Sequence, residues 1–212
     1  MADLEFFFDP VCPWAWITSR WVSEVKKLRD YDVTWRFISL RMTNEEIGYN
    51  DAGEEYRALH AVGTQILRTA ALARAEAGNE AVEQIYTAVG TAIHKLQQRD
   101  EMLHNPTFFL VDVLSRANLN VDWAKAADNE EFDAIIREET NLAYSRTGKN
   151  LGTPILTFKP GQANEGSFFG PVISQIPRGD EALKLWDAVE LIATTSGMAE
   201  LKRSLRSTPD FN

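Results

Sequence analysis

The sequence predicts an α/β fold that an all-helical segment interrupts, and three observations support this prediction. A strand, a helix and a second strand follow one another within the first 40 residues. Apolar residues then recur at every third or fourth position through roughly residues 54–147, which is the spacing of amphipathic helices. Short β-type runs return after residue 148. We therefore expect an α/β domain formed by residues 1–53 and 148–212, and a helical insertion domain formed by residues 54–147.

The N-terminal part has the pattern of a β–α–β unit. Residues 4–8 are apolar and aromatic, which is typical of a largely buried strand. Residues 14–28 place Ile17, Trp21 and Val25 on one stripe and so predict a helix. Residues 33–40 are again β-branched and aromatic, so the unit closes with a second strand, and its crossover is expected to be right-handed.

Helices are expected throughout the middle of the chain. A first helix spans about residues 56–77 and ends before Gly78, and a second carries the apolar residues from Val82 to Ile93. Two or three further helices are expected in residues 106–144. This segment carries no β-type run, which is why we assign it to an insertion.

The C-terminal part returns to the α/β pattern. Residues 155–158 predict a strand, and the short run at residues 167–169 predicts its hairpin partner. A helix is expected to include residues 182–192 and to close the domain. A last, amphipathic helix is expected at residues 199–205.

Composition and charge exclude several classes of function. The 212-residue chain has a formal net charge of -9, which argues against a nucleic-acid partner because phosphate binding needs clustered Lys and Arg. It has no apolar run of about 18 residues and no signal-peptide pattern, so we expect a cytoplasmic protein without a membrane partner. Its single cysteine cannot form an internal disulfide. The three histidines lack the spacing of metal ligands, so no metal is expected.

The residues that carry chemistry lie between the first strand and its helix. Pro13 is suited to the first helical turn, which leaves Cys12 near the N-cap. Free backbone N–H groups and the positive end of the helix dipole then face the sulfur. We therefore expect Cys12 to be the catalytic residue and to be a thiolate at neutral pH. Trp14 is either an apolar wall for a ligand or an aromatic side chain packed on the helix start.

A second element, Thr153-Pro154, opens the predicted strand that follows the helical segment. A proline at this place resembles the cis-proline that faces the active cysteine in thioredoxin folds. A cis bond there would let the backbone of Thr153 pair with a bound peptide or thiol in the manner of a strand. We expect the Thr153–Pro154 bond to be cis and to lie across from Cys12.

Three stretches together resemble a known family. The stretch at residues 8–21, FDPVCPWAWITSRW, is similar to the actinobacterial branch of the DsbA-like oxidoreductases and most of all to the mycothiol-dependent nitroreductases. The stretch at residues 168–179, FFGPVISQIPRG, and the stretch Gly152-Thr153-Pro154 resemble the same group. The resemblance covers nearly the whole chain.

The resemblance implies a thioredoxin fold with an all-helical insertion, as in DsbA-like proteins and kappa-class glutathione transferases. It implies thiol–disulfide chemistry at Cys12 without a tightly bound cofactor, with a low-molecular-weight thiol such as mycothiol as co-substrate. A small molecule or a protein disulfide would be the other substrate, and a homodimer is compatible with the pattern. Further ligand contacts are implied for Pro13, Trp14, Thr153 and Pro154, and positions that resemble polar or aromatic residues facing the cysteine add Asn44, Tyr56 and His94.

Each of these last three residues also has a structural interpretation. His94 is equally suited to be a hydrogen-bonded histidine on its helix, and Asn44 to be a loop or cap residue. Tyr56 fits the apolar stripe of its own helix. The sequence leaves both interpretations open for all three.

Ala15 is the main departure from the family pattern. Better-known members carry a second cysteine at this position, so Cys12 has no resolving partner in its own motif. Ala15 is then either natural to a monothiol member or an engineered replacement. A dithiol oxidase cycle is excluded for this chain, because it needs an internal disulfide.

Two other functional classes remain as alternatives. One is a kappa-class glutathione transferase or a 2-hydroxychromene-2-carboxylate isomerase, which share the architecture and hold glutathione without a covalent step. Cys12 argues against this class, and the absent second cysteine argues for it. The other is a non-catalytic module that binds peptides at the edge formed by Pro154.

Overall fold

The computed structural model describes residues 2–49 and 53–212, without the side chains of residues 46 and 47. Residues 1 and 50–52 of the expected first domain segment lie outside the described residues. Four strands form one mixed sheet in the order β2-β1-β3-β4. Their bounds are β1 Leu4–Phe8, β2 Val33–Phe37, β3 Ile155–Phe158 and β4 Gly166–Phe169. β1 pairs in parallel with β2 and antiparallel with β3, and β3 pairs antiparallel with β4.

The central strand β1 explains where the core lies. All five of its residues are buried, as expected for a strand with neighbours on both edges and helices on both faces. Successive side chains of a strand point to opposite faces. Phe6 and Phe8 accordingly join the main core with Trp35, whereas Phe7 joins a smaller cluster with Ile155.

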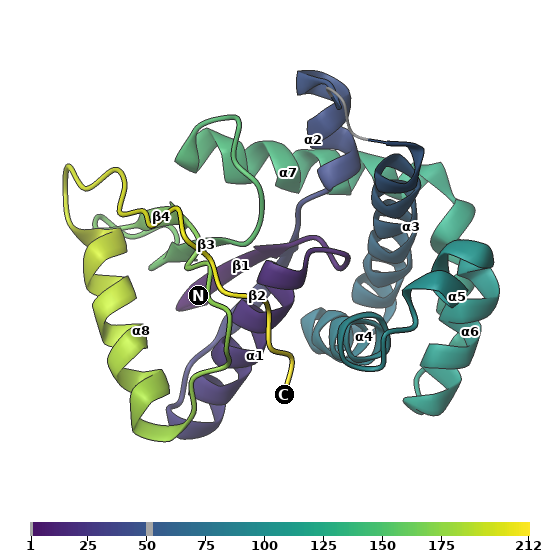
Figure 1. Cartoon of the computed structure of the whole chain (residues 1–212), viewed down its shortest axis with the longest axis horizontal. Helices are drawn as coiled ribbons and strands as arrows, with labels where there is room; N and C mark the ends of the chain where they lie inside the picture. The colour runs from purple at the N-terminus through teal and green to yellow at the C-terminus, as the bar shows by residue number, and fades with distance from the viewer. Residues whose placement is uncertain (1, 50–52) are drawn as a thin grey trace.

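Helices cover both faces of the sheet (Figure 1). On one face, α1 (Pro13–Leu28) packs against α8 (Gly179–Thr194) through the rings of Trp21 and Trp186, whose centroids are 5.2 Å apart. The Trp21 indole N–H also donates to the carbonyl of Ala182 at 3.0 Å. On the other face, the small cluster around Phe7 packs against α7 (Asp133–Thr147).

The expected helical segment is present. In the chain it lies between β2 and β3, and in space most of it lies to one side of the sheet (Figure 1). Its first helix, α3, begins at Glu54 and its last, α7, ends at Thr147. The helices between them are α4 Asn79–Gly90, a π-helical turn Thr91–Lys95, α5 Arg99–His104, α6 Pro106–Arg116 and two 3₁₀ segments, Val121–Asp128 and Glu130–Phe132. The division into two domains stays a prediction. The residues of α7 fall within the expected insertion, residues 54–147, yet this helix packs on the sheet.

A buried ionic network joins the insertion to the sheet. Arg36 of β2 donates to Glu139 of α7 at 2.7 Å and to Glu5 of β1 at 3.0 Å. Arg74 of α3 donates to the same Glu139 at 3.0 Å, and Arg146 of α7 pairs with Glu5. These hydrogen bonds satisfy carboxylates that would be costly to bury alone.

Two expectations about secondary structure are wrong. The second strand ends at Phe37, and α2 (Leu40–Ile47) begins almost at once, with the Ser39 hydroxyl accepting the N–H of Met42 as an N-cap. The expected helix at residues 199–205 is absent, and this segment has no regular structure. Leu201 and Leu205 are 75 % and 85 % exposed, so the core offers no apolar surface to stabilise a helix that is too short to persist alone.

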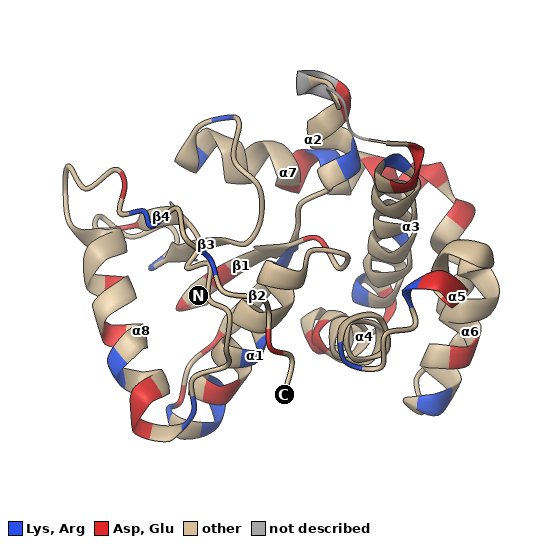
Figure 2. Ribbon diagram, viewed as in Figure 1, with Lys and Arg blue, Asp and Glu red and all other residues tan. Residues whose placement is uncertain are grey.

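Figure 2 shows that positively and negatively charged residues are interspersed along the helices. Among the described residues, no helix combines the length and apolar character that crossing a membrane requires.

Candidate functional site

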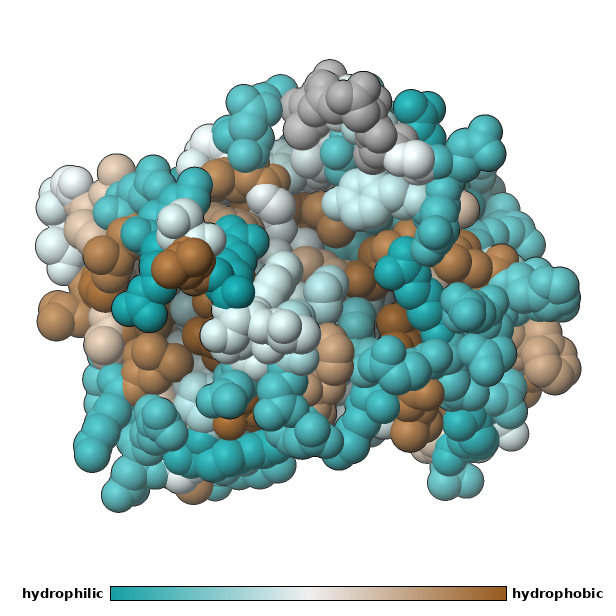
Figure 3. All heavy atoms as spheres, in the orientation of Figure 1, coloured by the Kyte–Doolittle hydropathy of each residue, from teal (hydrophilic) through white to brown (hydrophobic). Residues whose placement is uncertain are grey.

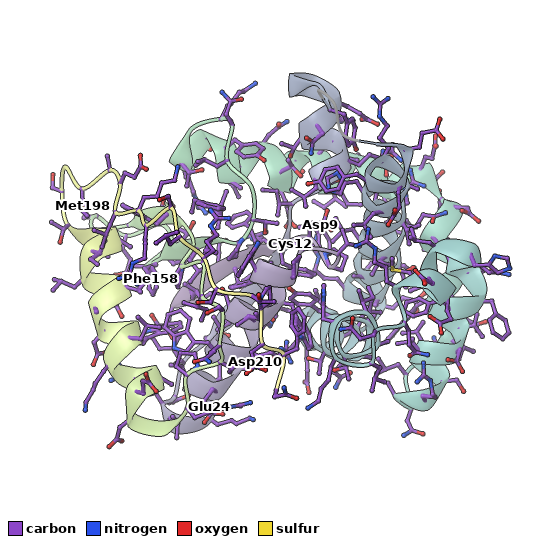
Figure 4. All side chains as sticks on the ribbon, in the orientation of Figure 1. Asp9, Cys12, Glu24, Phe158, Met198 and Asp210 are labelled. Atoms are coloured by element: carbon purple, nitrogen blue, oxygen red, sulfur yellow. The ribbon has the colours of Figure 1, made fainter. Side chains whose placement is uncertain are left out.

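Cys12 lies at the N-cap of α1, where β1 passes into the helix (Figure 4). Pro13 occupies the first helical position, and the Cys12 side chain makes no capping hydrogen bond to the helix. The thiol is only 7 % exposed and donates to the carbonyl of Thr153, with 3.3 Å between sulfur and oxygen. The expected juxtaposition of Cys12 and the Thr153-Pro154 loop is therefore observed across 141 residues of sequence.

The ionisation of Cys12 differs from the expectation. The pKa of the thiol is raised to about 12, mainly by burial and also by the neighbouring Asp9 carboxylate. The backbone N–H groups of Ala15 and Trp14 lower the pKa, as the helix N-terminus predicts, but by less than burial raises it. The prediction of a thiolate at neutral pH is thus wrong for this structure, because the sequence does not reveal how completely the sulfur is covered.

The Thr153–Pro154 peptide bond is cis, as expected, and so is Gly170–Pro171. The hydroxyl of Thr153 donates to the carbonyl of Phe7 in β1 at 3.0 Å, which fixes the loop to the central strand. The carbonyl of Pro154 accepts the N–H of Gly170 at 2.8 Å. These contacts hold the Thr153 carbonyl against the thiol.

Asp9 is a fully buried acid three residues before Cys12. Its carboxylate accepts the N–H of Val11 at 3.1 Å and the N–H of Leu40 at 2.8 Å, so it joins the cysteine loop to the start of α2. A Cβ at Gly63 of α3 would lie 2.8 Å from this carboxylate, so only glycine leaves room there. Burial raises the pKa of Asp9 to about 7, although both backbone hydrogen bonds lower it.

His94 packs behind the cysteine loop. Its Nε2 lies 3.0 Å from the carbonyl of Pro10, and its ring stacks on Trp16 at 5.8 Å between centroids. Burial lowers the pKa of His94 to about 4, so the ring is neutral at pH 7 and its Nε2–H donates to Pro10. The structural interpretation of His94 as a hydrogen-bonded histidine is therefore observed.

Asn44 and Tyr56 differ in what their side chains contact. The side-chain amide of Asn44 donates to the carbonyl of Leu40 at 2.7 Å, within its own helix α2. Tyr56 is 45 % exposed, and its ring lies 4.2 Å from that of His60. Burial raises the pKa of Tyr56, and the nearby Cys12 and Asp9 raise it further. Tyr56 is thus close enough to Cys12 for a thiolate there to raise the pKa of its hydroxyl.

Trp14 borders a large open cavity of about 1270 Å³ on the side of Cys12 away from the insertion. The first part of the C-terminal tail (residues 199–212), up to Ser207, forms one wall of this cavity, and the guanidinium of Arg206 lies 5.7 Å from the centre of the Trp14 ring. The tail crosses in front of α1 in Figure 1 and ends near α4. Trp14 therefore contacts both the tail and the space beside it.

Sequence reasoning missed Asp9, His60 and the tail. Asp9 interrupts an aromatic run directly before the cysteine motif, and this isolated acid was a signal for a buried polar contact. His60 and Arg206 carry no comparable signal, because their neighbours come from distant parts of the chain. Among residues 2–49 and 53–212, no group of three His, Cys, Asp or Glu side chains could hold a metal ion.

Comparisons with solved structures agree with this architecture. The cytosolic disulfide reductase DsbM from Pseudomonas aeruginosa superposes with a TM-score of 0.55 at 16 % identity, over 89 % of this chain and 98 % of that one. The same protein with GSH gives 0.57 at 15 % identity, over 89 % and 99 % of the two chains. At these identities the likeness shows a shared fold, which confirms the expected thioredoxin fold with a helical insertion.

Sequence comparisons give the family. An uncharacterized protein of Mycobacterium tuberculosis, Rv2286c, is 30 % identical over 207 residues, which span 96 % of this chain and 82 % of that protein. The family model described as Rv2466c-like, mycothiol-dependent nitroreductase Rv2466c, matches residues 11–203. That match takes in Cys12, the cis-proline loop and the whole insertion, so the chain belongs to the Rv2466c-like family of mycothiol-dependent nitroreductases.

Proposed function

We propose that this protein is a thiol-dependent oxidoreductase that works through the single thiol of Cys12. The observation that carries the proposal is the position of Cys12 at the N-cap of α1, with its sulfur 3.3 Å from the carbonyl that precedes the cis-proline. Two backbone N–H groups, of Trp14 and Ala15, approach the same sulfur. They favour the thiolate once water or a substrate reaches it.

The proposed cycle needs no second cysteine. The Cys12 thiolate attacks a disulfide R–S–S–R′, forms the mixed disulfide Cys12–S–S–R and releases R′S⁻. A second small thiol then attacks the mixed disulfide, restores Cys12 and leaves with R as a new disulfide. Mycothiol, which gives the family its name, is the proposed small thiol. A small electrophile such as a nitro compound is the proposed alternative substrate, with two thiols supplying each pair of electrons.

The proposed ligand contacts follow the geometry. Pro13 and Trp14 flank the thiol on the helix side, and Thr153 and Pro154 flank it on the strand side. Tyr56 is the remaining candidate with an exposed side chain. A cytoplasmic location and a homodimer are further parts of the proposal, and they rest on the sequence pattern.

The test is the Ala15→Cys variant. Ala15 is fully buried one helical turn after Cys12, so a thiol placed there lies within reach of the first sulfur. After incubation with glutathione disulfide, we expect the original chain to accumulate a one-to-one glutathione adduct, because nothing internal displaces it. The variant should form an internal disulfide and lose the adduct. Intact-mass spectrometry distinguishes the two products.

The Cys12→Ser chain is the control and should take up no glutathione. Equal adduct levels in the original chain and the Ala15→Cys variant would refute the role of a resolving cysteine. No adduct in either chain would instead favour the transferase or the peptide-binding alternative, neither of which has a covalent step.

A further inference from the structure

The cavity beside Trp14 is lined by residues from the two chain segments that adjoin the reactive thiol. Trp14 lies two residues after Cys12, and Gly152, which also lines the cavity, directly precedes Thr153. The carbonyl of Thr153 is the group that accepts the Cys12 S–H. A molecule that fills this cavity therefore lies against the two segments that enclose the sulfur.

The walls of the cavity are partly apolar and partly basic. Phe168, Val172 and Ile173 form apolar walls, and Figure 3 shows brown apolar side chains among polar ones on this face. Four cationic side chains line the cavity against two anionic ones, although the whole chain carries a net charge of -9. They are Arg146, Lys202, Arg203 and Arg206 against Glu181 and Glu200.

Two of these cations are free to meet a ligand. Arg146 is already paired with Glu5 and Glu165, and Lys202 lies 4.0 Å from Glu200. For Arg203 and Arg206, no ion pair with a carboxylate occurs in the part of the chain that the structure describes. The contact of Arg206 is with the face of the Trp14 ring.

The tail that carries these arginines is anchored beyond them. The N–H of Asp210 donates to the carbonyl of Ser174 at 2.7 Å. Phe211 packs against the core, with its ring 5.6 Å from that of His94. These contacts hold residues 202–206 over the cavity although the segment has no regular structure of its own.

We propose that the cavity beside Trp14 binds small molecules that carry a carboxylate, and that Arg203 and Arg206 recognise this group. The inference rests on the proposed function, because the bound molecule is the disulfide or electrophile that reacts with Cys12. A guanidinium matches a carboxylate through paired N–H donors, and the apolar walls take up the rest of the molecule. Arg203 and Arg206 are thus specificity-determining residues, whereas the reacting group is the thiol.

The experiment compares two reagents of nearly equal size, anionic iodoacetate and neutral iodoacetamide. Mass spectrometry gives the rate of Cys12 alkylation by each, and the iodoacetate-to-iodoacetamide ratio measures the selection for a carboxylate. In Arg203→Glu/Arg206→Glu we expect this ratio to fall by about threefold or more at low ionic strength, because each substitution reverses a charge beside the reagent's path. Added salt should lower the ratio of the original chain.

Matched variants separate charge from structure. Arg203→Lys/Arg206→Lys keeps both cations and should keep most of the ratio. Lys125→Glu reverses one charge on an exposed side chain of the insertion, away from the cavity, and should leave the ratio unchanged. The iodoacetamide rate shows whether a substitution displaces the tail, because a displaced tail would raise the rate with this neutral reagent as well.

Two results would overturn the inference in different ways. An unchanged ratio in the double Glu variant, with Cys12 still reacting with iodoacetamide, would refute carboxylate recognition and leave the proposed function standing. Failure of Cys12 to react with either reagent in the folded chain would refute both, because no accessible thiol would then exist.

Discussion

The two sides of Cys12 are built differently. On the insertion side, the cysteine loop is held by a hydrogen bond from His94 to Pro10, and by the buried Asp9 carboxylate, which abuts Gly63. On the opposite side, Trp14 faces an open cavity and a tail whose leucines are exposed. The first side fixes the thiol, and the second is, in our proposal, the side through which a reagent reaches it.

The two sides of Cys12 differ in how tightly their side chains are packed. Gly90 of α4 packs so tightly against Trp16 that an added Cβ would lie 2.2 Å from the ring. Gly152 on the cavity side has only an ordinary contact, 3.7 Å from Phe169 to an added Cβ. Substitutions on the insertion side should therefore change stability, whereas those on the tail side should change access.

The largest expected effect is that of Gly90→Ala. Its methyl group would overlap the Trp16 indole, and overpacking of this kind costs about 2–3 kcal/mol. Urea unfolding followed by circular dichroism measures the loss. Gly152→Ala, the matched substitution on the cavity side, should stay within about 0.5 kcal/mol. Equal losses in the two variants would contradict the contrast between the sides.

A second prediction concerns Asp9 and pH. Its pKa is raised by burial to about 7, so the folded state retains a proton that the unfolded chain loses near pH 4. The stability that this proton contributes is present below pH 4 and is lost as the pH rises to about 7. We therefore expect the original chain, relative to Asp9→Asn, to lose on the order of 2 kcal/mol of unfolding free energy between pH 4 and pH 7.

The free energy of unfolding of the original chain and of Asp9→Asn should be measured at both pH 4 and pH 7. The difference between the two chains then excludes the contributions of other titrating groups. His60 and His94, whose pKa values burial lowers to about 4, contribute stability above pH 6.5 that is lost as the pH falls. They act in the opposite direction to Asp9, but they are present in both chains and cancel in the difference. A difference that does not change with pH would show that Asp9 is ionised throughout.

A smaller loss of stability than those of Gly90→Ala and of the Asp9 titration is expected for Phe211→Ala. Loss of its ring from His94 weakens the anchor of the tail by about 1 kcal/mol, which raises the population with an open tail about fivefold. The rate of Cys12 alkylation by iodoacetamide should rise by a similar factor. Phe108→Ala removes the same ring from an exposed position on α6 and should leave the rate unchanged. Equal rates in both variants would show that the tail does not limit access.

The sequence predicts the parts of the molecule that local pattern determines. The aromatic run of β1, the proline at the first position of α1 and the periodic apolar residues of α3 each have one dominant structural solution, and all three are observed. The approach of Thr153 to Cys12 was predictable through the resemblance of its loop to a known fold. Roles of individual residues in binding stay predictions.

The remaining features depend on contacts that no local pattern encodes. The burial that raises the pKa of Cys12 comes from segments far apart in the chain, so the helix N-terminus alone gave the wrong ionisation state. The tail has a helical apolar spacing at residues 199–205, but its shape follows from the anchor at Phe211 and from the absence of apolar surface beneath its leucines. In this segment the tertiary contacts, and not the helical spacing of the apolar residues, determine the backbone conformation.

The ionic network around Arg36 has a consequence for how the chain unfolds. Arg36 of the sheet and Arg74 of the insertion share one buried carboxylate, Glu139. Separating the insertion from the sheet would break the hydrogen bonds that Glu139 accepts from Arg36 and Arg74 at the same time. The two parts should therefore melt together, in one cooperative transition, although the sequence divides them into separate segments.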